Sequence, residues 1–333
     1  MKLLIITQKV DKNDPTLGFF HRWIEKFAEI SEHVVVICLE MGEHRLPSNV
    51  KVLSLGKESG ESNLKYIFKF YKYIWQERKN YNSVFVHMNQ EYVLLGWKFW
   101  KLFGKKIFLW RNHAEGTFFT RLAVLFSNKV FYTSPQSFTA RFKKAQIMPV
   151  GIDTNFFKPD SSVQKKPNSI LFLGRISRVK NVELFIDALK DLKVDFFTTI
   201  AGGSAQKDIE YEKIIRNKIS NYGPKDRINF FGVVNQEGAL RLYREHVVYV
   251  NLTPAGSMDK TIFEALSVGL RVVSMNPDVK KMFSGVFDVK TGDRNGVAQA
   301  IKDALSSTTD TSSLQKSDYS LDSLMKKLEP ILR

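Results

Sequence analysis

Short runs of apolar, β-branched residues recur along the chain and alternate with segments in which apolar positions repeat every three or four residues. The short runs are typical of buried strands, and the periodic segments are typical of amphipathic helices. The runs predict strands at 1–7, 33–39, 50–55, 83–87, 106–110, 129–132, 145–150, 170–173, 196–200, 228–231, 247–252 and 271–274. Strands that alternate with helices in this way predict parallel sheets covered by helices on both faces.

A polar segment divides this alternation into two halves. Residues 158–169 contain Pro159 and Pro167 and few apolar side chains, which indicates a linker. We therefore expect two doubly wound α/β domains, as a length of 333 residues also favours. The expected organisation is an N-terminal domain at 1–153, a linker at 154–169, a C-terminal domain at 170–310, and a connector with a last helix at 311–333. Within the last segment, Ser320 would cap a helix at 321–329 and Pro330 would end it.

Several classes of protein are excluded by motifs that the sequence lacks. No G-x-G-x-x-G follows the first strand and no G-x-x-x-x-G-K-[ST] occurs, which argues against a dehydrogenase and a P-loop enzyme. Cys38 is the only cysteine, so no disulfide can form within the chain. No Asp-x-Asp and no His and carboxylate cluster has the spacing of metal ligands, so we expect no metal site. The first apolar run is too short for a signal peptide, and no stretch is long enough to span a membrane.

A basic loop follows the predicted strand at 170–173. Gly174 ends the strand, and Arg175, Arg178 and Lys180 precede a helix. An arginine offers a fork of hydrogen-bond donors and a lysine offers a point charge, and both suit a diphosphate. Taken alone, the segment fits a solvated basic loop equally well.

The order of five motifs makes this segment more informative. Gly174-Arg175 followed by Lys180 resembles the glycine–arginine…lysine motif of the retaining glycosyltransferases of family 4, which have the GT-B fold. Four further segments are similar to motifs of the family, at 148–159, 201–204, 228–234 and 264–274. The five motifs occur along this chain in the same order as in the family. The resemblance is strong over about 145–275 and weaker in the N-terminal half. It implies two Rossmann-like α/β domains that face a central cleft, the first for the acceptor and the second for a nucleotide sugar.

The resemblance also implies roles for individual residues. Arg175 and Lys180 would hold the donor diphosphate and stabilise the charge that develops on it as the glycosidic bond breaks. Glu264 would accept hydrogen bonds from the ribose hydroxyls, and the loop at 232–234 would meet the base. His113 resembles the family's histidine that contacts the transferring sugar or the acceptor. The expected donor-binding residues are Gly18, Gly174, Gly203, Val233, Ser257, Met258, Asp259, Lys260, Thr261 and Glu264.

One position departs from the family pattern. The family motif has two glutamates separated by seven residues, and the position that precedes Glu264 in this spacing is Gly256. Asp259 either substitutes for the missing carboxylate or simply caps the helix that begins near Thr261. Glu264 itself either binds the donor or is a surface residue of that helix. The departure keeps two alternatives to a transferase open, an inactive sugar-nucleotide-binding subunit and a sugar-nucleotide epimerase of the same architecture.

The charge of the chain is unusual. It carries 50 Lys and Arg against 34 Asp and Glu, a net charge of +16. Residues 65–106 hold nine basic and two acidic residues, interleaved with aromatic ones. This pattern suits an anionic membrane surface, with contacts from Lys65, Lys69, Lys72, Lys98 and Lys101. Alternatively, the aromatic side chains pack the core and the lysines are solvated. Nucleic acid is disfavoured because no recognition module is visible.

The resemblance implies a retaining glycosyltransferase. It would move a hexose from a UDP- or GDP-sugar to a hydroxyl group, without a metal or any cofactor besides the donor. The basic segment favours a lipid-linked glycan or a lipid as the acceptor, in cell-surface polysaccharide or glycolipid synthesis. We expect such a protein in the cytoplasm, peripheral at the inner face of the membrane.

Overall fold

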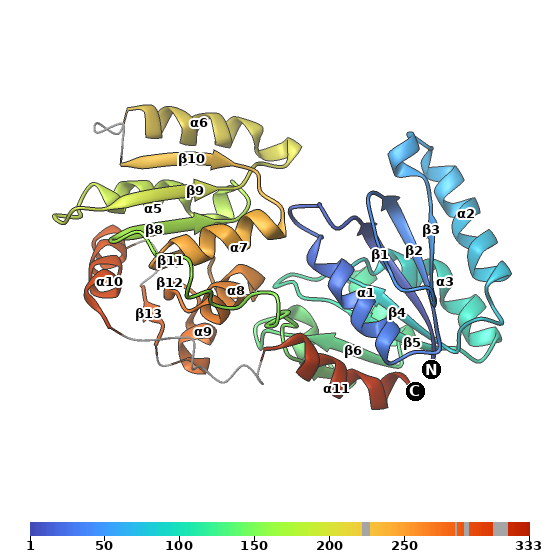
Figure 1. The fold of residues 1–333 in the computed structure, drawn as a ribbon. Coiled ribbons are helices and arrows are strands. Elements are labelled where there is room, and N and C mark those ends of the chain that lie inside the picture. Colours follow the sequence, from blue (N-terminus) through green and yellow to red (C-terminus); the bar gives the residue numbers. More distant parts are fainter. Residues whose placement is uncertain (222–226, 257, 284, 290–292, 309–318) are drawn as a thin grey trace. The chain divides into compact units, whose positions relative to one another are not determined.

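The computed structural model describes residues 1–221, 227–256, 258–283, 285–289, 293–308 and 319–333. The chain forms two compact units. The first comprises Met1–Gly151 and Ser317–Arg333, and the second comprises Ile152–Lys316. Each unit contains one parallel sheet with helices on both faces (Figure 1). The C-terminal end of the chain is therefore part of the unit that its N-terminal half builds.

The first unit contains a seven-stranded sheet of order β3-β2-β1-β4-β5-β6-β7, in which all neighbours are parallel. Its strands are β1 (Lys2–Val10), β2 (His33–Met41), β3 (Val50–Ser54), β4 (Ser83–His87), β5 (Lys106–Trp110), β6 (Lys129–Tyr132) and β7 (Ala145–Ile147). Its helices are α1 (Phe19–Glu29), α2 (Asn63–Gln76), α3 (Glu91–Leu102), α4 (Phe118–Phe126) and α11 (Leu321–Leu332).

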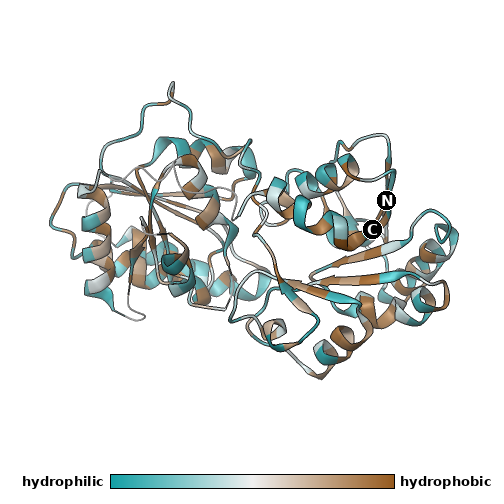
Figure 2. Ribbon diagram, turned by 90° about the horizontal axis from the view of Figure 1, so that it is seen from below, coloured by the Kyte–Doolittle hydropathy of each residue, from teal (hydrophilic) through white to brown (hydrophobic). Residues whose placement is uncertain are grey.

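Side chains alternate between the two faces of this sheet, as strand geometry requires. Leu3 and Ile5 of β1 pack in one apolar core with residues of α1 and α11. Leu4 and Ile6 pack in a second core with residues of α2, α3 and α4. Figure 2 shows hydrophobic residues concentrated in the strands. Both faces of the sheet are therefore buried, which explains why its strands are continuous apolar runs.

The second unit contains a six-stranded sheet of order β10-β9-β8-β11-β12-β13, again with parallel neighbours. Its strands are β8 (Ser169–Leu173), β9 (Phe197–Ala201), β10 (Ile228–Gly232), β11 (Val248–Asn251), β12 (Arg271–Ser274) and β13 (Phe287–Asp288). Its helices are α5 (Val182–Leu189), α6 (Ile209–Ser220), α7 (Gln236–Glu245), α8 (Lys260–Val268), α9 (Pro277–Met282) and α10 (Arg294–Ser306). Phe185 of α5, Ile215 of α6 and Ile301 of α10 share one core.

The strands predicted from the sequence are confirmed, except that β7 ends at Ile147 and not at residue 150. The strand β13 was not predicted. The predicted end of the last helix is wrong, because α11 continues past Pro330 to Leu332. Pro330 is exposed, so water can satisfy the carbonyl that its missing N–H leaves free. Leu332 is fully buried, and its carbonyl accepts a hydrogen bond of 2.6 Å from Ser83 Oγ. Packing against the sheet thus holds the last turn in place. None of the described helices is both long enough and apolar enough to cross a membrane.

Candidate functional site in the second unit

The candidate site lies at the carboxyl end of the sheet in the second unit. β8 pairs with β9 on one side and with β11 on the other, so the strand order reverses at β8. In open α/β sheets, ligands bind outside the carboxyl ends of the strands at such a switch point. The loops that follow β8 and β11, together with α8, carry most of the catalytic and donor-binding residues that the sequence predicted.

Glycines allow the backbones at the ends of two strands, β8 and β9, to approach closely. Gly202 has a φ of +138°, and a Cβ atom added there would lie 1.8 Å from the carbonyl oxygen of Gly174. Backbone hydrogen bonds join these loops, from Gly174 N to Ala201 O at 3.1 Å and from Ile176 N to Gly203 O at 2.9 Å. The loops after β8 and β9 therefore form one rigid platform under the basic segment.

Lys180 is held by residues that come from the end of β11. It ends a single turn of 3-10 helix, Arg178–Lys180, and the next residue, Asn181, is left-handed with a φ of +52°. Asn181 Nδ2 donates to Leu252 O at 2.9 Å, which fastens this turn to the strand. Lys180 Nζ donates to Thr253 Oγ1 at 3.1 Å and forms an ion pair with Asp259 Oδ2. The ammonium group is therefore oriented before any ligand binds.

Asp259 is the centre of this network. Its Oδ2 also accepts hydrogen bonds from Thr253 Oγ1 at 2.7 Å and from Asn251 Nδ2 at 3.0 Å. Burial by itself would raise the pKa of Asp259, but the charge of Lys180 and these hydrogen bonds hold that pKa below its ordinary value. Asp259 occupies the N-cap position of α8, yet its side chain makes no capping hydrogen bond. The interpretation of Asp259 as a helix cap is therefore wrong, because its carboxylate pairs with Lys180 instead.

Glu264 lies on α8 and is buried, so its interpretation as a surface residue is wrong. Its Oε2 accepts a hydrogen bond of 2.9 Å from the hydroxyl of Tyr243, on α7. Burial raises the pKa of Glu264 to about 7, against the opposing effects of the Tyr243 hydroxyl and the Lys260 charge. Burial lowers the pKa of Lys260, one helical turn earlier, also to about 7. This end of α8 thus holds two groups that titrate near neutral pH.

Four functional candidates of the second unit were not found from the sequence: Tyr243, Tyr249, Asn251 and Thr253. The hydroxyl of Tyr249 is 2.7 Å from Thr261 Oγ1 and 3.0 Å from Leu173 O, so it joins α8 to the end of β8. Asn251 ends the buried strand β11 and Thr253 follows it closely, and polar residues at such a strand end are a signal that could have identified them. Nothing in the local sequence marks Tyr243, because its partner is on another helix.

The remaining predicted donor residues border this network. A Cβ atom on Gly203 would lie 2.6 Å from Val233 Cγ2, so the two residues are neighbours in space. Val233 is 61% exposed, so this part of the site is open to solvent. Met258 is buried, with its sulfur 3.9 Å from Asn276 Nδ2. Arg175 is exposed. Ser257 lies outside the described residues.

The other predicted residues lie in the first unit. Gly18 precedes α1, and a Cβ atom there would lie 2.5 Å from Asp14 O, so the turn requires glycine. His113 is exposed in the loop after β5, where its Nδ1 accepts a hydrogen bond of 3.0 Å from the backbone N–H of Glu115. The predicted membrane-facing residues Lys65, Lys69 and Lys72 lie on α2, and Lys98 and Lys101 lie on α3.

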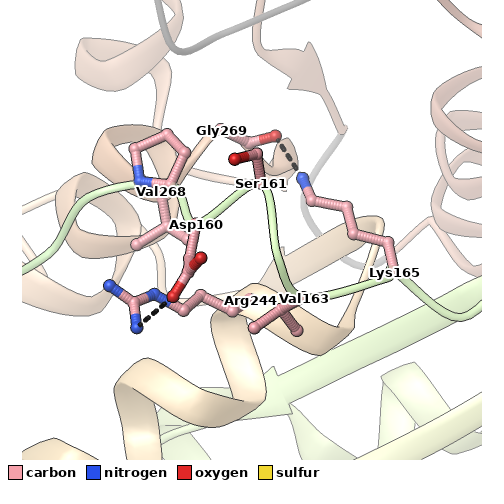
Figure 3. Close-up of a pocket in the computed structure, with 8 residues that line it drawn as sticks. Asp160, Ser161, Val163, Lys165, Arg244, Val268 and Gly269 are labelled. Carbon is pink, nitrogen blue, oxygen red and sulfur yellow. Dashed lines mark hydrogen bonds and ion pairs between the residues drawn. The ribbon is translucent and has the colours of Figure 1, made fainter.

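A pocket of about 270 Å³ lies elsewhere in the second unit (Figure 3). Its charged lining residues are already paired, since Arg244 bridges to Asp160 at 3.3 Å and Lys165 Nζ donates to Gly269 O at 2.9 Å. Lys165 precedes β8, Arg244 precedes β11 and Gly269 precedes β12. The pocket is therefore at the amino end of the sheet, away from the loops that carry the predicted site.

Residues 153–316 match the family model of glycosyl transferases group 1. The second unit is thus similar to the group 1 glycosyl transferases. The match spans this unit almost from end to end. No curated protein sequence matches the chain.

Solved structures resemble the whole chain, including the unit that precedes the matched residues. HepE of Anabaena, crystallised with UDP and glucose, has a TM-score of 0.79 at 15% identity, over 100% of this chain and 99% of that one. Sucrose-phosphate synthase of Thermosynechococcus elongatus has a TM-score of 0.76 at 15% identity, over 99% and 98%. The lipopolysaccharide outer core galactosyltransferase WaaB has a TM-score of 0.62 at 16% identity, over 99% and 95%. The two Rossmann-like domains are those of the GT-B fold, as the sequence predicted.

Proposed function

We propose that the protein transfers a hexose from a nucleoside-diphosphate sugar to a hydroxyl acceptor, with retention of anomeric configuration. The observation that carries this proposal is the oriented ammonium group of Lys180 at the switch point of a unit similar to the group 1 glycosyl transferases. A fixed positive charge there suits the charge that a departing diphosphate develops. Structures of HepE with UDP and with UDP-glucose favour a UDP-sugar as the donor.

The proposed chemistry breaks the bond between the anomeric carbon and the phosphate oxygen. The acceptor oxygen bonds to the anomeric carbon on the face from which the diphosphate leaves, and the hydroxyl proton passes to the departing phosphate oxygen. Arg175 and Lys180 would stabilise the negative charge on the diphosphate. α8 begins beside Lys180, which pairs with its N-cap residue Asp259, and the first N–H groups of α8 also favour an anion. No step in this scheme requires a metal ion.

In the same scheme Glu264 would meet the ribose hydroxyls, and the loop that includes Val233 would meet the base. His113 and the turn at Gly18 would serve the transferring sugar and the acceptor. We propose a lipid-linked glycan or a lipid as that acceptor, at the cytoplasmic face of the membrane. The assay is transfer from UDP-sugars and GDP-sugars with analysis of the linkage formed, in the presence and absence of EDTA. Release of UDP without a transferred sugar, or loss of transfer in EDTA that a divalent ion restores, would contradict the proposal.

Gly256 favours one alternative. The carboxylate expected at that position is absent, and the nearby Asp259 is occupied by Lys180, so the contact to the donor sugar is reduced. A subunit that binds nucleotide sugars without turning them over would also fit this arrangement. Donor affinity without transfer or hydrolysis for any acceptor would favour that alternative, and an altered sugar on the recovered nucleotide would favour an epimerase.

We expect Asp259→Asn to lower kcat by about 10- to 100-fold with a smaller effect on KM, because Lys180 loses the charge that orients it. The same change should lower the free energy of unfolding by about 1–3 kcal/mol, since it leaves a largely buried ammonium without a counter-ion. Steady-state kinetics and urea denaturation measure both effects. Asp187→Asn is the matched control, because Asp187 pairs with Lys218 at 2.6 Å between α5 and α6. Equal kcat in the two variants would show that Asp259 does not position Lys180.

We expect donor affinity to fall as the pH rises above 7. Lys260 has a pKa of about 7 in the free protein, and a bound diphosphate favours its charged form, so binding above pH 7 takes up a proton. Affinity should fall by up to about tenfold for each unit above pH 7 until the pKa of the complex is reached. Calorimetry with UDP-glucose in buffers of different ionisation enthalpy measures the proton uptake.

Lys260→Met should remove most of this pH dependence. Lys213→Met, at an exposed lysine of α6, should keep it. Proton uptake that is unchanged in Lys260→Met would assign the dependence to another group.

A further inference from the structure

The basic helices of the first unit expose an apolar ridge. On α2, Leu64 is 80% exposed, Phe68 is 71% exposed and Trp75 is 52% exposed. These positions recur at helical spacing and therefore share one face of α2. The opposite face packs into the core through Phe70 and Ile74, which are buried. An apolar helix face that remains in solvent is unusual and marks an interaction surface.

The ridge continues onto α3. The ring of Trp75 lies 6.0 Å from that of Phe99 and 5.8 Å from that of Phe103. Beside them, Leu102 is 81% exposed. The hydroxyl of Tyr71 donates to Leu95 O at 2.8 Å, which also joins the two helices. We call the exposed side chains of Leu64, Phe68, Tyr71, Trp75, Leu102 and Phe103 the α2–α3 ridge.

Lysines flank the ridge. Lys65 and Lys72 follow Leu64 and Tyr71 in sequence and are exposed on α2, and Lys98 and Lys101 are exposed on α3. Lys65 and Lys69 each pair with Glu61 at 3.2 Å, so part of their charge is compensated. The ridge is thus an apolar surface with positive charge along its sides.

The sequence left open whether the aromatic and leucine side chains of residues 64–103 pack in the core or face a membrane. In the structure, some of them are buried and others are exposed. Phe70 and Trp100 are buried core residues, as the packing interpretation requires. Phe68, Trp75 and Leu102 are exposed beside the lysines, which the packing interpretation does not explain. A second function is needed for this exposed set.

We propose that the α2–α3 ridge binds an anionic lipid bilayer, with its apolar side chains in the interfacial region and its lysines on the headgroups. Charge complementarity favours this occupant, because basic flanks around exposed aromatic and leucine side chains suit anionic headgroups over acyl chains. A second copy of the chain is disfavoured, since two ridges would place lysines against lysines. The inference deepens the proposed function, on which it rests for the lipid nature of the acceptor. The membrane contact itself can be measured without catalysis.

The test is flotation of the full chain with vesicles of phosphatidylcholine containing increasing fractions of phosphatidylglycerol, at low and high salt. One variant replaces Leu64, Phe68 and Leu102 by serine, and another replaces Lys72, Lys98 and Lys101 by glutamine. These side chains are exposed, so the fold should survive, which thermal unfolding verifies. The matched control is Ile214→Ser with Lys213→Gln on α6, where the isoleucine is 44% exposed.

We expect the bound fraction to rise with phosphatidylglycerol and to fall with salt, and the partition coefficient of each triple variant to fall by about tenfold or more. The control should bind like the unaltered protein. Recovery of the unaltered protein in the unbound fraction at every composition at low salt would overturn the proposal. So would binding that the ridge variants do not weaken, or self-association in sedimentation that the serine variant abolishes. Binding of UDP to each variant, measured separately, tests the donor site, so failure of one proposal is distinguishable from failure of the other.

Discussion

Replacement of Lys180 by alanine is expected to lower kcat by about 100-fold or more, because each preorganised group that stabilises transition-state charge contributes on this scale. Arg175→Ala should have a similar effect on kcat. Lys180 is the better oriented of the two, through Thr253 and Asp259, whereas Arg175 is exposed and would engage only when the donor binds. Initial-rate kinetics with a UDP-sugar and its acceptor measure both variants.

The matched control is Arg178→Ala in the same loop. Arg178 is exposed, lies 4.0 Å from Glu183 and places its guanidinium 5.0 Å from the ring centroid of Tyr211. We expect its kcat to stay near that of the unaltered protein. Because Lys180→Ala leaves Asp259 without its counter-ion, its fold must be verified by urea denaturation, and Lys180→Ala combined with Asp259→Asn separates lost stability from lost catalysis. Turnover that stays normal in folded Lys180→Ala and Arg175→Ala would remove the proposed diphosphate site.

Leu328→Ala is expected to lower the free energy of unfolding of the first unit by about 2–5 kcal/mol, the usual cost of a cavity at a buried leucine. Leu328 is on α11 and is fully buried in the same core as residues of α1 and of the seven-stranded sheet. Denaturant unfolding monitored by tryptophan fluorescence measures the change, since Trp23 and Trp110 lie in that core.

Lys327→Ala provides the matched control, one residue away on the exposed side of α11. Its effect should stay within about 0.5 kcal/mol, as for most surface substitutions. We propose that the donor binds to the other unit, so affinity for UDP should be similar in both variants. A small effect of Leu328→Ala on stability would mean that α11 contributes little to the first unit in solution.

Much of the fold followed from local patterns. A strand that is buried on both faces must be largely apolar, so the runs at 33–39 and 170–173 predicted strands whose bounds lie within two residues of those observed. The Gly174-Arg175…Lys180 segment was likewise placed correctly in the loop after β8, because it follows directly on the apolar run at 170–173. Gly202 was less obvious, since its need for glycine arises from Gly174, which is distant in sequence and adjacent in space.

Local patterns were misleading where a distant partner changes the balance of energies. Pro330 predicted a helix end, but burial of Leu332 and the hydrogen bond from Ser83 extend the helix beyond it. Asp259 had the position and the side chain of a helix cap, but the charge of Lys180 is a stronger partner than a backbone N–H. Glu264 could be a surface glutamate by sequence, and only the packing of α7 on α8 buries it against Tyr243.

By itself, the sequence determined that the chain forms two α/β units, each with a parallel sheet. It also determined that a basic turn follows the first strand of the second sheet. These properties depend on periodicity and on residue type, which are local. Only the tertiary structure decided that α11 belongs to the first unit, that Asp259 holds Lys180, and which aromatic residues of 64–103 are buried and which form the α2–α3 ridge. The physical reason is that burial and charge pairing are properties of pairs of segments, and no single segment encodes the neighbour that it will meet.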